Sequence, residues 1–451
     1  MPEKKYILVY GAGISGCGVA EVLANDGDRV VLYNDEPKAI TPQLEELLVR
    51  QGGAYLCTAL PPTLLAQVGQ LVLSPGIAFD CPLAVSLRTH GIETVSEVEI
   101  ASRLYSGQMI AITGTNGKTT TTMLVGAMLA CLPVKTAVGG NIGLALSKEI
   151  GGLDATSWLA AELSSFQLEG VQTLKPKIAV ILNITPDHLE RHGTMTNYSA
   201  AKKKIFSRQT AEDITILNAD DPLVAACATE TRGRVCFISR KQILPEGIYL
   251  QAGEFVLAWQ GETTAICRVE ELKIFGAHNE ENVLAAIGCA FFAGVTKAAI
   301  KKVLCAFEGV EHRLEYVRTV AGVKYYNDSK ATNPDSTMKA LESFSGQVIL
   351  LAGGHDKMTE LEPLMELVRA KTEVLILLGE AKERFGAAAK AGGVTNVQIV
   401  NSFEEAVALA YKLAAAPQVV LLSPACSSYD MFDNFPQRGC YFKKLVNQLG
   451  E

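Results

Sequence analysis

Paired cysteines, long apolar stretches and an excess of basic residues are all missing from this sequence. Its eleven cysteines include no Cys-x-x-Cys pair and are odd in number, so neither a disulfide framework nor a zinc site is predicted. The longest apolar run, Val283 to Val295, is about 13 residues long, whereas crossing a bilayer takes about 20, so we expect no membrane span and a buried helix there. With 41 basic and 48 acidic residues, the composition argues against a nucleic-acid partner.

Targeting signals and repeats are also missing. After Met-Pro-Glu-Lys-Lys the chain passes directly into a predicted strand, Tyr6 to Tyr10, which leaves no room for a signal peptide, so we expect a cytoplasmic protein. The length of 451 residues predicts about three domains. A content of 48% hydrophobic and 20% charged residues is typical of a soluble globular enzyme.

The segment Gly114 to Thr120, GTNGKTT, is the clearest functional signal. A predicted strand, Met109 to Ile112, precedes it, and a predicted helix, Thr121 to Ala130, follows it. Glycines let successive N–H groups converge on a phosphate, and the helix N-terminus adds positive potential. Lys118 would then contact the terminal phosphates, and the Thr119 hydroxyl would bind Mg²⁺.

This loop departs from the usual P-loop pattern, because the position six residues before the lysine is Ile112 instead of glycine. The alternative is a glycine turn that caps an ordinary helix and leaves Lys118 in solvent. The strand, glycine loop and helix in succession favour polyphosphate binding.

A second glycine loop, Gly11 to Gly16, lies between the first predicted strand and a helix that runs to about Ala24. The next strand, Arg29 to Tyr33, leads to Asp35, which completes a dinucleotide-binding fingerprint. That pattern is typical of an NAD-dependent dehydrogenase, but any nucleotide diphosphate satisfies the same loop, and UDP is one. Fewer than 100 residues separate this loop from the phosphate loop at Gly114, which weakens the dehydrogenase interpretation. Asp35 could also be a simple turn residue.

Two predicted strands end in candidate metal ligands. Thr156 to Ala161 ends in Glu162, and Lys177 to Leu182 leads to His188. Carboxyl ends of parallel strands face the ligand crevice, so both side chains are expected beside the triphosphate. A lone histidine is more often a polar turn residue, and Mg²⁺ prefers oxygen, so an imidazole ligand would need anionic help nearby. A further glycine-rich turn is predicted at Gly139 to Gly143.

Lys202 could supply that help. Tyr198 four residues before it and Phe206 four after it put Lys202 on the apolar face of a predicted helix, while Lys203 and Lys204 point more toward solvent. A partly buried lysine has a lowered pKa and a larger neutral fraction, which is the form that adds CO₂ to become a carbamate. The residues alone favour a snorkelling side chain.

The last part of the chain has four predicted strands separated by helices, which indicates another doubly wound sheet with polar loops at one edge. These strands are Val323–Tyr326, Val348–Ala352, Val374–Leu378 and Gln418–Leu422. Before them, Asn279 and Asn282 share one face of a helix start and could contact an adenine, although Asn279 could equally be an N-cap.

The GTNGKTT loop resembles that of the Mur ligases and their folylpolyglutamate synthase relatives, and the resemblance extends over essentially the whole chain. The strings that carry it are SPGI at Ser74, HNEEN at His278, NDSKATNP at Asn327 and SPACSSYDMF at Ser423. The last two are similar to the branch of the family that adds D-glutamate, since the branches that add diaminopimelate or lysine carry a DYAH-type string in place of the first.

The resemblance implies roles for individual residues. ATP would be bound by Gly114, Thr115, Asn116, Gly117, Lys118, Thr119, Thr120, Asn279, Asn282, Arg313 and Asp328. The UDP substrate would contact Ile14, Ser15, Asp35, Gly76 and Asn141. D-Glutamate would lie among Lys330, Thr332, Lys357, Ser428 and Phe435, although Thr332 could instead cap the following helix. Catalysis would depend on Lys118, Glu162, His188 and Lys202, with two Mg²⁺ ions at Thr119, Glu162 and His188 and with Lys202 carbamylated.

The sequence therefore predicts a three-domain α/β enzyme in which each domain is a mostly parallel, doubly wound sheet. We expect a Rossmann-like UDP-binding domain at 1–98, a P-loop domain at 99–309 and a Rossmann-like amino-acid-binding domain at 310–451. The expected reaction is ATP-dependent ligation of D-glutamate to UDP-N-acetylmuramoyl-L-alanine in peptidoglycan synthesis, by a monomer. Two rivals remain, an oxidoreductase that uses the first glycine loop and a nucleotide-gated switch without amide chemistry.

Overall fold

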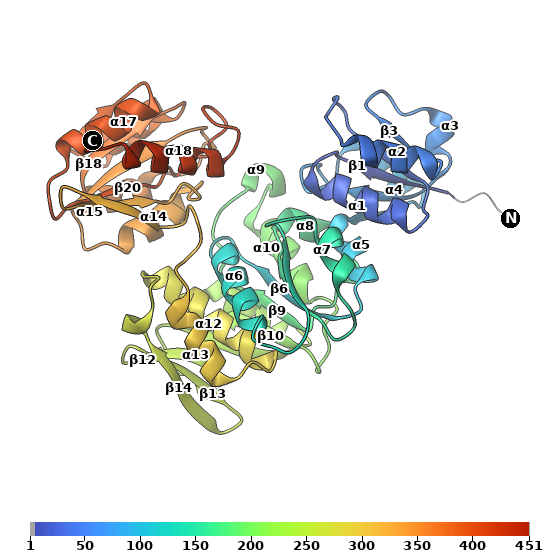
Figure 1. Cartoon of the computed structure of the whole chain (residues 1–451), viewed down its shortest axis with the longest axis horizontal. Helices are drawn as coiled ribbons and strands as arrows, with labels where there is room; N and C mark the ends of the chain where they lie inside the picture. The colour runs from blue at the N-terminus through green and yellow to red at the C-terminus, as the bar shows by residue number, and fades with distance from the viewer. Residues whose placement is uncertain (1–4, 451) are drawn as a thin grey trace. The chain divides into compact units, whose positions relative to one another are not determined.

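A computed structural model describes residues 5–450, and these form three mostly parallel sheets with helices packed on them (Figure 1). This confirms the predicted α/β class. The chain divides into two compact units, Met1–Glu271 with Glu281–Cys305, and Leu272–Glu280 with Ala306–Glu451. The first unit contains two sheets, and the second contains one.

The first sheet has five parallel strands in the order β3-β2-β1-β4-β5. Its strands are β1 Tyr6–Tyr10, β2 Val30–Tyr33, β3 Ala54–Leu56, β4 Val68–Leu73 and β5 Glu93–Ser96. Its helices are α1 Ile14–Asn25, α2 Pro42–Arg50, α3 Pro62–Leu65, α4 Pro82–Thr89 and α5 Glu97–Leu104. Because the strand order reverses between β1 and β4, the carboxyl ends of these two strands are the place where such folds bind ligands.

The second sheet has nine strands in the order β14-β13-β12-β11-β10-β9-β6-β8-β7. Its strands are β6 Gln108–Thr113, β7 Thr136–Gly140, β8 Trp158–Glu162, β9 Ile178–Ile181, β10 Ile214–Asn218, β11 Arg234–Ser239, β12 Gly247–Gln251, β13 Glu254–Trp259 and β14 Glu262–Arg268. Pairing is parallel from β7 to β12 and antiparallel from β12 to β14. The phosphate loop therefore follows a central strand, β6, with β8 and β9 on its two sides.

The helical segments of this region are mostly short. They are α6 Lys118–Leu129, α7 Leu146–Glu149, η1 Ile150–Gly152, α8 Ser165–Glu169, α9 Leu189–His192, α10 Met195–Lys203, η2 Lys204–Phe206, α11 Pro222–Ala225, η3 Ala226–Thr229, η4 Val269–Glu271, α12 Ala277–Phe292 and α13 Lys297–Ala306. Most of the apolar run from Val283 to Val295 lies in α12, which ends at Phe292, and its first residues are buried as predicted. No helix among residues 5–450 is long and apolar enough to span a membrane.

One sequence prediction in this region was wrong. Gly139 and Gly140 were expected in a glycine turn, but they form the end of strand β7. Gly140 has φ 104°, and a Cβ there would lie 2.2 Å from the carbonyl oxygen of Glu162 on the neighbouring strand. Glycine is needed at this position because two strands approach closely, so the turn begins one residue later than predicted, at Asn141.

The third sheet has six strands in the order β15-β16-β20-β17-β18-β19, with only β15 antiparallel. Its strands are β15 Glu315–Val320, β16 Val323–Asn327, β17 Val348–Gly353, β18 Thr372–Leu378, β19 Val397–Ile399 and β20 Val419–Leu422. Its helices are α14 Pro334–Glu342, α15 Glu362–Lys371, α16 Lys382–Ala391, α17 Phe403–Leu413 and α18 Phe435–Asn447. One apolar cluster packs the sheet against α14, α15 and α16, and another packs it against α17 and α18. The four predicted strands are present, whereas the edge strands β15 and β19 were missed.

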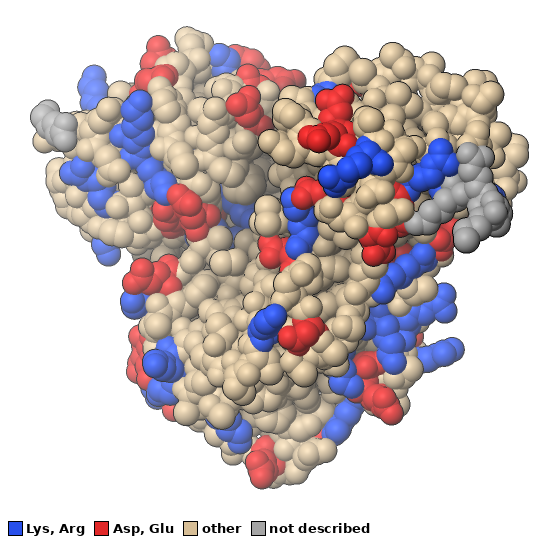
Figure 2. All heavy atoms as spheres, turned by 45° about the vertical axis from the view of Figure 1, so that its right-hand side comes forward, with Lys and Arg blue, Asp and Glu red and all other residues tan. Residues whose placement is uncertain are grey.

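Acidic and basic side chains are mixed over most of the face that Figure 2 shows. This fits a chain in which the two signs nearly balance, with a formal net charge of −7.

Candidate active site

The phosphate loop joins β6 to α6 through a left-handed glycine. Gly117 caps α6 with φ 84°, a conformation that residues with a side chain rarely adopt. A Cβ at this position would also lie 2.2 Å from the Oδ1 of Asn282, on α12. Both the conformation and the close approach require glycine, and they place Asn282, a predicted ATP ligand, directly against the loop.

The loop is tied to the segment that follows β9. The backbone N–H of Thr115 donates to the carbonyl oxygen of Asn183 at 3.0 Å. The N–H of Asn116 donates to the Oδ1 of Asn183 at 2.8 Å. The Thr115 hydroxyl donates to the carbonyl oxygen of Thr185 at 3.1 Å. Asn183 therefore holds the loop in shape, and the sequence analysis did not identify it.

Two lysines converge on the carbonyl oxygen of Gly114. Lys118 donates to it at 2.9 Å and also to the carbonyl oxygen of Thr115 at 2.7 Å. Lys202, on α10, donates to the same oxygen at 2.7 Å. The structure thus brings together two of the predicted catalytic residues on one backbone atom.

Lys202 is buried, with only 1% of its surface exposed. Burial, and then the neighbouring Lys118 charge, hold the pKa of Lys202 well below its ordinary value, and Asp187 only partly offsets this. The ammonium also lies 4.5 Å from the centre of the Tyr198 ring. The prediction that Lys202 belongs to the apolar face of its helix is therefore confirmed.

The two following lysines differ from one another. Lys203 is half-exposed and pairs with Glu230 at 2.5 Å. Lys204 was expected to point toward solvent, but its Nζ donates to the carbonyl oxygen of Glu169, and burial lowers its pKa. Lys204 therefore contacts the end of α8, which the helical pattern alone does not reveal.

Glu162 ends β8 and is almost fully buried. The Asn141 side-chain amide donates to its Oε1 at 2.9 Å, while its Oε2 is buried without a hydrogen-bond partner. The Thr120 hydroxyl beside Lys118 is likewise buried without a partner. A buried carboxylate oxygen that lacks a donor is unfavourable unless a cation balances it, and Mg²⁺ prefers such hard oxygen ligands. The residues present therefore fit Mg²⁺.

His188 precedes α9 in a left-handed conformation, φ 54°. Its ring packs on Phe166, with centroids 4.8 Å apart, and its two nitrogens lie 3.6 Å from Asp187 and 3.5 Å from Glu190. These carboxylates supply the anionic surroundings that an imidazole ligand of Mg²⁺ would need. The metal role of His188 stays a prediction.

The sequence analysis predicted a UDP crevice at the loops after β1 and β4, and the structure joins these two loops. A Cβ on Gly16 would lie 1.7 Å from the carbonyl oxygen of Gly11, so the first turn of α1 can pack on the loop only with glycine. The Ser74 hydroxyl donates to that same oxygen at 2.7 Å and joins the two loops. Ile14 is 73% exposed at the start of α1, and Asp35 accepts hydrogen bonds from two tyrosine hydroxyls.

Arg191, on α9, links this crevice to the segment that carries His188, and the sequence analysis missed it. Its guanidinium donates to the carbonyl oxygens of Pro75 at 3.3 Å and of Ile77 at 2.9 Å, on either side of Gly76. It also pairs with Glu169 at 2.7 Å.

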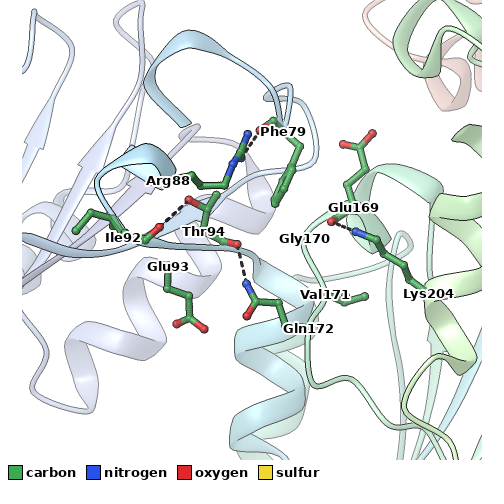
Figure 3. A pocket seen from close by; sticks show the side chains of 11 residues that line it. Phe79, Arg88, Ile92, Glu93, Thr94, Glu169, Gly170, Val171, Gln172 and Lys204 are labelled. Atoms are coloured by element: carbon green, nitrogen blue, oxygen red, sulfur yellow. Dashed lines mark hydrogen bonds between the residues drawn. The ribbon is translucent and has the colours of Figure 1, made fainter. Parts of the chain in front are cut away.

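A groove of about 480 Å³ lies beside this contact (Figure 3). The Phe79 ring lies within it, with the Arg88 guanidinium 4.7 Å from the ring centre and the Lys204 ammonium 5.9 Å away. The residues that line the groove are all different from the predicted site residues.

In the second unit, Asp328 directly follows the last residue of β16 and is buried. Its carboxylate accepts from the backbone N–H of Leu314 at 3.2 Å and from the Ser423 hydroxyl at 2.8 Å. Burial raises the pKa of Asp328 to about 7, and the positive charge of Arg313 opposes the shift. The structure places Arg313 and Asp328, two of the predicted ATP ligands of this unit, near one another, while the ribose contact stays a prediction.

Two alternatives for predicted site residues are removed by the helix caps. The side chain of Asn333 caps α14 by accepting from Ser336, so Thr332 is not the cap. Helix α12 begins at Ala277, which puts Asn279 inside its first turn, where its amide donates to the carbonyl oxygen of Phe275 at 2.8 Å.

The residues predicted to bind D-glutamate, here called the acceptor residues, lie in the loops that follow β16, β17 and β20, except for Phe435, which begins α18. Lys330 lies with its Nζ 5.3 Å from the centre of the Phe435 ring. Ser428 is buried, and Lys357 is half-buried in the loop after β17. These polar residues gather at one edge of a parallel sheet, which is where such folds bind ligands.

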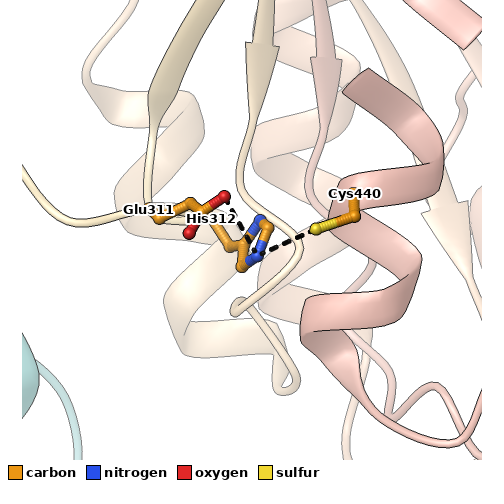
Figure 4. A group of neighbouring side chains, drawn as sticks. All are labelled: Glu311, His312 and Cys440. Carbon is orange, nitrogen blue, oxygen red and sulfur yellow. Dashed lines mark hydrogen bonds and ion pairs between the residues drawn. The ribbon is translucent and has the colours of Figure 1, made fainter. Parts of the chain in front are cut away.

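Glu311 and Cys440 flank the His312 ring and place one potential metal ligand atom each within 4.8 Å of one another (Figure 4). The Asn327 amide, however, donates to the Nδ1 of His312 at 2.9 Å. Burial lowers the pKa of His312 and so favours its neutral form. Because Nδ1 accepts from Asn327, the proton of that neutral ring lies on Nε2, the atom that faces Cys440. Lys443 pairs with Glu311. The cluster is therefore a hydrogen-bonded support for the start of the second unit.

Comparison of the sequence with known proteins finds two family matches along the chain. The Mur ligase middle domain family matches residues 112–290, and the Mur ligase glutamate ligase domain family matches residues 312–426. A UDP-N-acetylmuramoylalanine–D-glutamate ligase of Pelotomaculum thermopropionicum is 42% identical over 448 residues, which are 99% of this chain and 98% of the relative. The ligase of the same name from Geotalea uraniireducens is 41% identical over 447 residues, 99% and 98% of the two chains.

Solved structures share the fold at low identity. A pseudomurein peptide ligase type C from Methanothermus fervidus superposes with a TM-score of 0.61 at 16% identity, covering 98% of this chain and 99% of that one. A UDP-N-acetylmuramate–alanine ligase from Thermotoga maritima gives 0.59 at 19% identity, covering 98% of both chains.

Proposed function

This chain belongs to the Mur ligase family, and we propose that it joins D-glutamate to UDP-N-acetylmuramoyl-L-alanine with the hydrolysis of ATP. The observation that carries this is the full-length match to D-glutamate ligases at about 40% identity, together with a phosphate loop that the structure holds in shape. The product is a precursor of peptidoglycan.

The reaction divides into two steps. The terminal carboxylate of the UDP substrate attacks the γ-phosphorus of ATP, the bond to ADP breaks, and an acyl phosphate forms. The amine of D-glutamate then attacks the acyl carbon, the amide bond forms, the amine loses a proton and inorganic phosphate leaves. No side chain needs to act as a covalent nucleophile, so the protein acts by positioning and charge stabilisation.

Phosphate binding is the task of the loop after β6. The backbone N–H groups from Thr115 to Thr120 and the N-terminus of α6 would hold the phosphates, and Lys118 would exchange its loop carbonyls for the γ-phosphate. Asn279 and Asn282 would contact the adenine. Arg313 and Asp328, in the second unit, would bind the phosphates and the ribose.

Mg²⁺ would be held by Thr119, by the unpartnered oxygen of Glu162 and, for a second ion, by His188. When bound, it neutralises phosphate charge during transfer. A carbamate on Lys202 would place an anion where the unmodified side chain has an amine. The low pKa of Lys202 supports this, because the carbamate forms from the neutral amine.

The UDP substrate would lie in the crevice between the loops after β1 and β4, against Ile14, Ser15, Asp35 and Gly76, and would reach Asn141. D-Glutamate would contact Lys330, Thr332, Lys357, Ser428 and Phe435. We further propose three domains at 1–98, 99–309 and 310–451 in a cytoplasmic monomer that binds neither nucleic acid nor membrane.

A test of the chemistry is isotope transfer. With ¹⁸O in the terminal carboxylate of UDP-N-acetylmuramoyl-L-alanine, one labelled oxygen should appear in the released phosphate, because the acyl phosphate retains it. Unlabelled phosphate would contradict this path. The oxidoreductase rival predicts nicotinamide binding, measurable by fluorescence, and the switch rival predicts phosphate release without both other substrates.

A further inference from the structure

Arg438, on α18, is the largest fully buried side chain of the molecule among the described residues, with 1% of its surface exposed. It makes four hydrogen bonds, all to a hydroxyl or to backbone carbonyls. Its Nε donates to the Ser329 hydroxyl at 3.0 Å, and its two terminal nitrogens donate to the carbonyl oxygens of Ser329 at 2.9 Å, Cys426 at 3.1 Å and Ser427 at 3.1 Å. A buried guanidinium is costly unless its donors are satisfied, so these contacts fix the loops that provide them.

The contacted loops are the ones that carry the proposed acceptor residues. Ser329 precedes Lys330, and Ser427 precedes Ser428. The Ser329 hydroxyl in turn donates to the carbonyl oxygen of Phe435 at 2.8 Å. One guanidinium therefore sets the relative positions of two loops and of the start of α18.

The loop that carries Lys357 packs against Ser427 and Arg438. A Cβ on Gly354 would lie 2.3 Å from the carbonyl oxygen of Ser427 and 3.1 Å from the guanidinium of Arg438. The backbone N–H of His355 donates to that same carbonyl at 3.0 Å. All of the proposed acceptor loops thus meet within contact distance of Arg438.

The loop after β20 has a strained backbone that contacts from outside the loop must stabilise. Ala425 is buried with φ 57°, a left-handed conformation that is unfavourable for a residue with a Cβ. The next two carbonyls, of Cys426 and Ser427, are the ones that Arg438 binds. Burial lowers the pKa of Arg438 to about 10, so it remains a cation at neutral pH and its hydrogen bonds are charge-assisted.

We propose that Arg438 is a positioning residue of the D-glutamate subsite. Its guanidinium holds the loops of Lys330, Lys357 and Ser428 at the spacing that the two carboxylates of the amino acid require. The inference rests on the proposed function. Arg438 itself, buried beneath the loops, would not touch the substrate.

The test compares Arg438→Lys and Arg438→Ala with Phe442→Leu, a control on the same helix. Phe442 is fully buried but belongs to the apolar cluster formed with β15, β16 and α17. Lysine keeps the charge but cannot span both loops, so Arg438→Lys should raise the KM for D-glutamate at least about tenfold. The KM for the UDP substrate should stay within about twofold. Phe442→Leu should lower the melting temperature without moving the KM for D-glutamate.

Chemical rescue adds a readout that a merely structural role would not move. Millimolar guanidinium should restore much of the D-glutamate affinity of Arg438→Ala, because the ion fits the space that truncation leaves, and should not affect Phe442→Leu. If Arg438→Ala fails to fold, the KM of Arg438→Lys for D-glutamate is the deciding measurement. An unchanged KM for D-glutamate in a folded Arg438→Lys variant, or an equal rise in the KM of all three substrates, would overturn the inference while the proposed function stands. Wild-type protein without D-glutamate-dependent phosphate release would overturn both.

Discussion

Lys202 donates a hydrogen bond from its buried Nζ to the carbonyl oxygen of Gly114, 2.7 Å away, beneath the phosphate loop. The loop carbonyl therefore lies between this lysine and Lys118, which donates to it at 2.9 Å. Two positive charges in such proximity are unfavourable together, and the low pKa of Lys202 relieves the conflict.

We expect Lys202 to carry a carbamate in the active enzyme. Lys202→Ala should lose most activity and regain part of it with acetate, which can supply the missing carboxylate, whereas Lys203→Ala should stay near wild type. A ¹³C NMR carbamate signal after labelling with ¹³C-bicarbonate checks the modification directly. Full activity of Lys202→Ala, or active protein without that signal, would refute the expectation.

Lys118→Ala should abolish phosphate release and leave the fold intact, because the change removes a phosphate-binding charge and no core packing. Its Nζ donates to the carbonyl oxygens of Gly114 and Thr115, which belong to its own loop. Loss of activity with an unchanged circular dichroism spectrum and melting temperature is the expected result. A folded variant that turns over ATP at the wild-type rate would count against the loop as the phosphate site.

Gly117→Ala should weaken ATP binding by at least about tenfold, because the left-handed backbone and the Asn282 side chain both exclude a Cβ. Gly151→Ala is a matched control, since a Cβ there would meet open space. Isothermal titration with ATP measures both. Equal affinities in the two variants would show that the tight approach to Asn282 is unimportant for nucleotide binding.

Alanine variants of Lys330, Thr332, Lys357 and Ser428 should mainly raise the KM for D-glutamate. Two lysines facing a dianionic amino acid each contribute charge-assisted hydrogen bonds worth roughly 1.5 to 3 kcal/mol, so the lysine variants should lose about ten- to a hundredfold in affinity. Steady-state kinetics with each substrate varied in turn is the measurement. The assignment fails if only the KM for the UDP substrate changes.

The stability of the second unit should depend on pH through Asp328. Its pKa is about 7 in the folded chain against 3.8 ordinarily, chiefly because it is buried, so the folded state binds more protons between these values. Its contribution to stability therefore decreases as the pH rises from about 4 through about 7. Asp328→Asn should remove this decrease, and the melting temperature should fall less between pH 5 and pH 8 than in wild type. An identical fall in both proteins would contradict the raised pKa.

The phosphate loop and the three parallel sheets could be predicted because their signals are local. Gly114 and Gly117 are close in sequence, and strands buried on both faces are continuous apolar runs. Strands β15 and β19 were missed because most of their residues, at the sheet edges, are exposed or only partly buried, so they lack that pattern.

Residues that act between distant segments carry no local signal. Arg438 is 109 positions from Ser329 in the sequence, and Arg191 is 116 positions from Pro75. In each case an isolated arginine on a helix has the same appearance as a solvated one, and only the folded chain reveals the carbonyls that it binds. Lys202 could be placed on an apolar face from its neighbours, but its contact with Gly114 could not.

The most direct test of the account measures phosphate release with UDP-N-acetylmuramoyl-L-alanine, ATP and one amino acid at a time, with mass spectrometry of the product. The account predicts release and a D-glutamyl product with D-glutamate, and little of either with L-glutamate, D-aspartate, L-lysine or meso-diaminopimelate. Comparable turnover with L-lysine or diaminopimelate, or release that does not depend on the UDP substrate, would contradict it.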